Sequence, residues 1–140
     1  MKNPSSTLLN AYMNALKSSL SYNLVAVPVY NTILPEAEVN NYVLINEISG
    51  DPISSKQRDY KNIGVQISVV TIFDSFILNT SVADDILDQI FTILEVKPDL
   101  SPDFNLVVLA EEQTEALTQQ LTTKTIHQKI VRYRNEIERI

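Results

Sequence analysis

The chain has 140 residues, of which 44% are hydrophobic and 20% are charged, and its formal net charge is −6 at pH 7. This length is typical of one domain built around a single core, so residues 1–140 are expected to form one domain. No apolar run reaches the roughly 20 residues of a membrane-spanning helix. The first residues lack the continuous apolar stretch of a signal peptide, so we expect neither a membrane protein nor a targeting segment.

Two residue types that build common sites are scarce. Cysteine is absent, which excludes disulfides and thiolate metal sites and leaves the cytoplasm as the expected site of folding. Glycine occurs only at Gly50 and Gly64, too few for the glycine-rich loops that hold phosphate groups. The sequence therefore predicts no cofactor, no metal and no catalytic residue.

The first third of the chain predicts a helix followed by two strands. Residues 8–20 (LLNAYMNALKSSL) have apolar side chains at three- and four-residue spacing, as in an amphipathic helix, with Ser6 or Thr7 as its N-cap. Residues 24–33 (LVAVPVYNTI) are rich in β-branched residues, and Pro28 lacks a backbone N–H, which favours a short strand at a sheet edge. Residues 41–49 (NYVLINEIS) alternate and predict the next strand.

A polar stretch at residues 51–62 (DPISSKQRDYKN) follows this strand. It is longer than the roughly two to five residues that a hairpin connection needs. Two interpretations fit its composition equally: a solvated hairpin tip, or an arm that becomes ordered against another chain with Tyr60 as its anchor. The charged side chains that would set the register of such an arm are Asp51, Lys56, Arg58, Asp59 and Lys61.

Residues 62–74 (NIGVQISVVTIFD) give the longest strand pattern in the sequence. One face is apolar from Ile63 to Phe73, and polar side chains alternate with it. Val70 and Ile72 lie on the second face. Part of this strand is therefore expected to be covered on both sides, by a partner or by another layer.

The next segment, residues 79–96 (NTSVADDILDQIFTILEV), predicts a second amphipathic helix. Ser81 and Asp84 have the spacing of a capping box, and Asp84, Asp85 and Asp88 lie near the positive end of the helix dipole. Asp84 and Asp88 share a helix face and invite a metal or acid–base interpretation. The dipole role is favoured, because no histidine or further carboxylate stands at matching spacing.

The C-terminal part predicts two more strands. Residues 104–112 (FNLVVLAEE) form the first, and residues 121–140 favour a strand over a short terminal helix at their end. His127, the one histidine, is expected at the surface. Arg132 and Arg134 flank Tyr133 and could contact nucleic acid, but we favour a structure in which Tyr133 enters the core and the arginines pair with the acidic middle of the chain.

These elements predict an α+β fold, namely a mainly antiparallel β-sheet with two amphipathic helices packed on one face. The charge is uneven along it: residues 62–123 hold ten acidic residues and one basic residue, whereas residues 124–140 hold five basic and two acidic residues. A protein that grips DNA phosphates would show a dominant basic face. This distribution argues against such a role.

Several pieces of the sequence carry a family resemblance. They are a proline-bearing link into NYVLI, a long alternating strand that ends in FD, an acidic amphipathic helix directly after it, and a late strand KIVRYRNEI with alternating basic residues. Together with the opening helix they cover about residues 7–135. In order and pattern they resemble the tail-terminator family of tailed bacteriophages, also called tail-completion or neck proteins.

The resemblance implies a non-enzymatic virion protein that is assembled in the host cytoplasm. Its subunits would form a homo-oligomeric ring in the neck, a hexamer with a dodecamer as the alternative, between the head-side connector or portal-associated proteins and the tail tube. DNA would pass through the lumen without sequence-specific binding. The arm at residues 51–62 would reach the adjacent ring or tube, and Arg132 and Arg134 would lie at subunit contacts.

Two other classes of function stay open at this stage. One is a small soluble adaptor that binds a partner protein through the same loop as a monomer or dimer. The other is a hydrolase that uses Asp84, Asp88 and a metal ion, which the spacing of the carboxylates supports only weakly.

Overall fold

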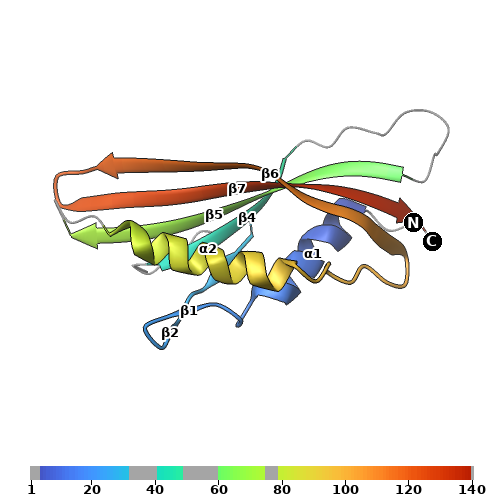
Figure 1. The fold of residues 1–140 in the computed structure, drawn as a ribbon, viewed down its shortest axis with the longest axis horizontal. Coiled ribbons are helices and arrows are strands. Elements are labelled where there is room, and N and C mark those ends of the chain that lie inside the picture. The colour runs from blue at the N-terminus through green and yellow to red at the C-terminus, as the bar shows by residue number, and fades with distance from the viewer. Residues whose placement is uncertain (1–3, 32–40, 49–59, 75–78, 140) are drawn as a thin grey trace.

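A computed structural model describes the chain at residues 4–31, 41–48, 60–74 and 79–139. Five strands form one sheet in the order β3-β4-β5-β7-β6, and β1 and β2 form a separate hairpin (Figure 1). Within the sheet, only β3 and β4 run parallel. The elements are α1 (Pro4–Leu16), β1 (Ser21–Tyr22), β2 (Val25–Ala26), β3 (Val29–Tyr30), β4 (Asn41–Ile48), β5 (Tyr60–Asp74), α2 (Thr80–Leu94), β6 (Phe104–Gln120) and β7 (Lys124–Arg139).

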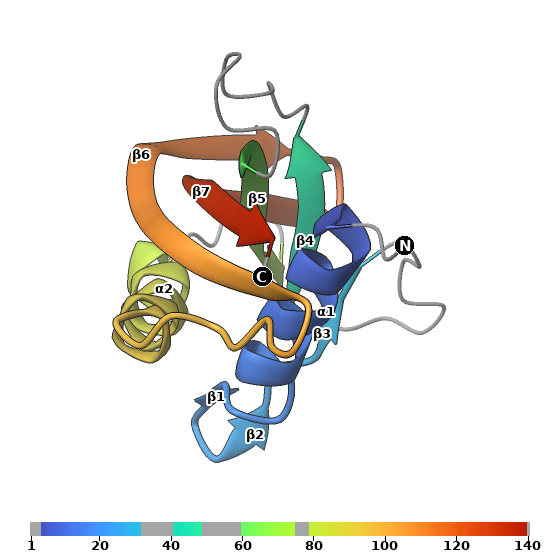
Figure 2. The ribbon, with the colours of Figure 1, turned by 90° about the vertical axis from the view of Figure 1, so that its right-hand side faces the viewer.

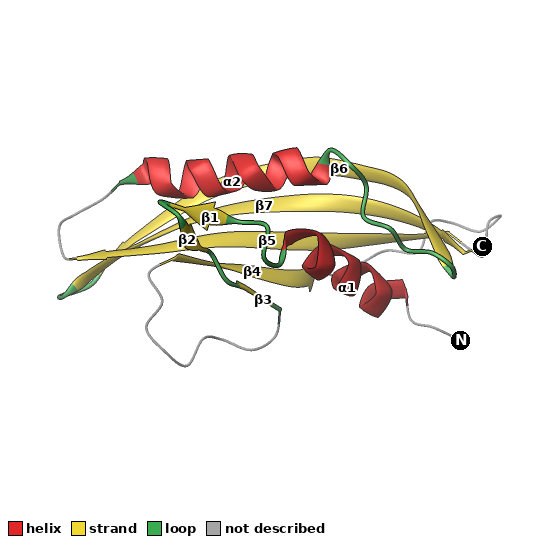
Figure 3. Cartoon of the chain, turned by 90° about the horizontal axis from the view of Figure 1, so that it is seen from below, coloured by secondary structure: helices red, strands yellow, loops and turns green. Residues whose placement is uncertain are grey.

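Both helices lie on one face of the sheet, as Figures 2 and 3 show. The α+β prediction is therefore confirmed. Apolar side chains from α1, α2 and the facing side of the strands form one core. Those that are fully buried include Leu8, Leu16, Val43, Ile45, Val65, Ile67, Ile86 and Ile90.

The sheet face opposite the helices is called the outer face below. In β4, β5 and β7 the even-numbered residues point to it, because side chains alternate along a strand and the odd-numbered ones enter the core. Val70 lies on this face and is nevertheless only 3% exposed. Its cross-strand neighbours are the longer residues Tyr42 and Gln128. Among the described residues no second layer lies on this face, so the expected cover by a partner stays a prediction.

The predicted helix caps are both displaced. Helix α1 begins at Pro4, so Ser6 and Thr7 lie inside it, and proline suits a first helical position because its missing N–H would be unpaired there. Helix α2 is capped by Asn79, whose Oδ1 accepts hydrogen bonds from Ser81 N at 3.1 Å and Ser81 Oγ at 2.6 Å.

Strands β6 and β7 form a long hairpin at one side of the sheet (Figure 1). Strand β6 runs well past the predicted end at residue 112, and β7 continues as a strand through Arg139, which confirms a strand over a terminal helix. Two irregularities interrupt the β6–β7 register, between Leu106 and Val108 and between Glu111 and Gln113. From Gln113 to Gln120 the register is continuous.

Candidate functional site

The predicted arginine pair lies on the outer face, where Arg132 joins three strands. Its Nε donates to Gln66 Oε1 of β5 at 3.1 Å. Its Nη1 donates to Gln113 Oε1 and to Glu115 Oε1 of β6, at 3.0 and 3.2 Å. The guanidinium therefore holds β6 to the centre of the sheet through side-chain contacts.

Arg134 makes a looser contact, with 3.9 Å between its Nε and Glu112 Oε1 and with both side chains about half exposed. Ion pairs this open contribute little to stability. Tyr133 points the other way into the core and packs edge-on against Tyr12, with ring centroids 6.4 Å apart. The interpretation in which the arginines pair with the acidic middle segment is therefore confirmed, and the pairing occurs within one chain.

The predicted arm falls largely outside the described residues, as do Asp51, Lys56, Arg58 and Asp59. The end of the predicted loop is corrected, because β5 already begins at Tyr60. Residues 60–62 pair with residues 136–138 of β7, which extends far enough to offer them a partner. Lys61 is thus part of the sheet, opposite Ile137.

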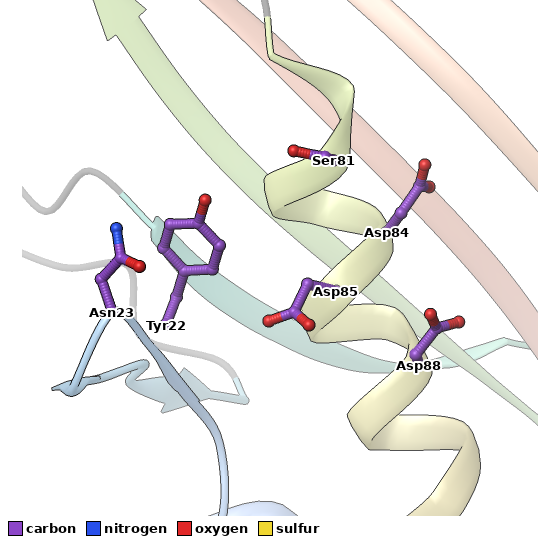
Figure 4. A pocket seen from close by; sticks show the side chains of 6 residues that line it. All are labelled: Tyr22, Asn23, Ser81, Asp84, Asp85 and Asp88. Atoms are coloured by element: carbon purple, nitrogen blue, oxygen red, sulfur yellow. The ribbon is translucent and has the colours of Figure 1, made fainter.

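The three aspartates of α2 line an open depression of about 540 Å³ together with Ser81 and with Tyr22 and Asn23 of the β1–β2 hairpin (Figure 4). Asp84 forms an ion pair with Lys129 Nζ at 2.9 Å. Asp85 accepts a hydrogen bond from Gln89 Nε2 at 3.1 Å. Within the described ranges, no three His, Cys, Asp or Glu residues are grouped so that they could hold a metal ion.

His127 is 3% exposed, so its predicted place at the surface is wrong. It shares the parity of Val131 and Tyr133 and therefore faces the helical side of the sheet. Its Nδ1 lies 3.0 Å from Thr118 Oγ1, and its Nε2 is buried without a hydrogen-bond partner. Burial lowers the pKa of His127 below its usual range, and the nearby Lys129 cation lowers it further.

The β1–β2 hairpin is a surface feature that the sequence does not predict. Its two-residue turn holds Asn23 at φ 51° and Leu24 at φ 65°, the left-handed region that glycine and asparagine normally occupy. For a leucine this conformation costs roughly 1–2 kcal/mol. The Leu24 side chain is 102% exposed and that of Val25 is 67% exposed, so no contact within the described chain offsets the cost.

A scan against protein-family models finds no match, and a search of the curated proteins finds none either. No helix in the part of the chain that the structure describes is both long and apolar enough to cross a bilayer.

Proposed function

We propose that the protein is a non-enzymatic structural subunit of a bacteriophage neck or tail-terminator ring. The ring would join the head-side connector to the tail tube in the virion and let DNA pass through its lumen. The proposal rests on the family resemblance of the sequence, with which the α+β fold is consistent.

The outer face is the observation that carries the proposal. It has no helical layer among the described residues (Figure 1), yet it presents apolar side chains on four neighbouring strands. They are Tyr42, Leu44, Ile72, Ile126 and Leu117. A closed ring is built from heterologous contacts, in which one face of a subunit covers a different face of the next. In the ring, a different surface of the neighbouring subunit would cover this sheet face.

The charge distribution supports the same role. The acidic side chains of α2 and β6 belong to residues 62–123, which hold ten acidic residues and one basic residue. Such a surface would repel phosphates rather than bind them. A passage lined in this way would let DNA slide without capturing it. Arg132 and Arg134 are already engaged by residues of β6, so they add little free positive charge.

The test is the state of assembly, measured by mass photometry and negative-stain electron microscopy. We expect rings, alone or with purified connector or tail-tube protein. Ile126 is half-buried on the outer face, and Ile126→Lys should prevent ring formation. Val96 is exposed just beyond α2, and Val96→Lys should not prevent it. A monomer at every concentration that also fails to join either partner would refute the ring and favour the monomeric adaptor.

The hydrolase alternative makes a different prediction. If Asp84 and Asp88 held a catalytic metal, Asp84→Asn with Asp88→Asn would abolish function. The ion pair of Asp84 with Lys129 favours a structural role instead. We therefore expect the double variant to assemble normally.

A further inference from the structure

The β1–β2 hairpin projects from the helical side of the molecule, away from the sheet (Figure 2). We propose that its tip, Leu24 and Val25, docks into an apolar socket rimmed by basic side chains on a different protein. This inference does not depend on the ring proposed above, because the tip and the outer face lie on opposite sides of the sheet.

Leu24 combines a strained backbone conformation with full exposure. A residue with φ 65° that needed only to close the turn would be glycine or asparagine. Leucine adds a large apolar side chain there, and that side chain is 102% exposed. Strained residues that gain nothing within their own chain tend to mark contact sites, which points to a partner that buries this side chain.

The hairpin is held firmly at its base. Gln89 of α2 accepts a hydrogen bond from Ser21 N at 3.1 Å and donates one to Ser21 O at 2.7 Å. Leu20 and Val27 anchor the base in the core and are joined by a backbone hydrogen bond of 2.9 Å. A tip that is already fixed loses little conformational entropy when it binds.

The surroundings of the tip indicate the chemistry of the partner. Beside the tip, Tyr22 and Asn23 form one side of the depression whose other side carries Asp84, Asp85 and Asp88 (Figure 4). In the described structure the carboxylate of Asp88 has no ion-pair or hydrogen-bond partner. Complementary charge near an apolar anchor speeds encounter and excludes wrong partners, so the socket should be flanked by lysine or arginine.

A second copy of the chain fits this requirement poorly. Several of its described cations are already engaged: Lys129 by Asp84, Arg132 by Glu115, and Lys97 by the carbonyl of Val107. A symmetric contact through this side would also bring the aspartates of both copies together. We therefore place the basic rim on another protein.

The experiment places the photo-crosslinking residue p-benzoylphenylalanine at position 24, in the cells that naturally make the protein. The matched control carries it at position 96, where Val96 is 77% exposed just beyond α2. We expect a cross-link from position 24 alone, to an apolar site with at least two neighbouring basic residues on another protein. Leu24→Asn should then weaken binding of that purified protein at least tenfold.

A stability measurement makes the test complete. Asparagine tolerates the left-handed conformation, so Leu24→Asn should raise Tm by about 2 °C, while Leu117→Asn should not. Three results would overturn the proposal: no cross-link from position 24, equal cross-links from both positions, or cross-links to a second copy or to an acidic surface. A fall in Tm for Leu24→Asn would show that the backbone at Leu24 is not strained, and it would contradict the proposal.

Discussion

Tyr12 and Asn135 form a buried polar contact that joins α1 to the centre of the sheet. The Tyr12 hydroxyl donates to Asn135 Oδ1 at 2.6 Å, and Asn135 Nδ2 donates to the carbonyl of Ile63 at 3.0 Å. Both side chains are fully buried. Burial raises the pKa of Tyr12, so its hydroxyl is protonated and acts as a donor at neutral pH.

Tyr12→Phe removes this donor and little else. The ring stays against Tyr133, but Asn135 Oδ1 is left buried without its partner, which costs roughly 1–3 kcal/mol. For a domain of this size, a loss of about 2 kcal/mol lowers Tm by about 6 °C. Because the deleted atom is small, we expect the change to come from the unpaired oxygen and not from a cavity.

The assay is urea unfolding followed by circular dichroism, with Tyr42→Phe as the control. Tyr42 is half-buried on the outer face and packs its ring against Tyr30 at 6.1 Å, so its hydroxyl should contribute less than about 0.5 kcal/mol. Asn135→Leu completes a double-mutant cycle with Tyr12→Phe, and the coupling should be about 1 kcal/mol or more. If Tyr12→Phe costs no more than Tyr42→Phe, the contact does not stabilise the fold as argued.

Three further outcomes are expected. Because the pKa of His127 is lowered in the folded chain, the unfolded chain takes up the proton first, and stability is lost as the pH falls below about 6.5. His127→Gln should therefore flatten the fall of Tm between about pH 7.5 and pH 5.5. An unchanged slope would contradict this. Replacing residues 53–59 with Asn-Gly keeps Tyr60 in β5 and should leave Tm nearly unchanged. Ring assembly, followed by electron microscopy, should fail. Early unfolding or normal assembly would show that this segment is not an assembly arm. Lys129→Ala should cost less than about 1 kcal/mol in urea unfolding, because its ion pair with Asp84 is partly exposed, and the cost should shrink with added salt.

The main strands and helices are predictable because each carries its own periodic pattern. Strand β5 alternates over most of its length, and α2 has an apolar stripe at helical spacing. Strand β6 beyond residue 112 has no such pattern, since most of its side chains there are exposed. It is a strand because β7 pairs with it residue by residue, and that long-range contact leaves no local trace.

The misplaced features have equally specific causes. The sequence Asn79-Thr80-Ser81 offers three residues able to cap a helix, and only the backbone geometry selects Asn79. The β1–β2 turn has no glycine, so the usual pattern for a two-residue hairpin is missing. His127 lies an even number of residues from Tyr133, so the alternation of the strand puts both side chains on the core side of the sheet.

The two proposed contact surfaces can be separated experimentally because the sheet lies between them. Ile126 points to the outer face, and Leu24 lies in the turn between β1 and β2. This hairpin lies on the helical side of the sheet (Figure 2). Substitutions at distant sites without shared partners act independently. Loss of rings in the Ile126→Lys variant with an intact cross-link from position 24 would support both surfaces, and failure of one would leave the other standing.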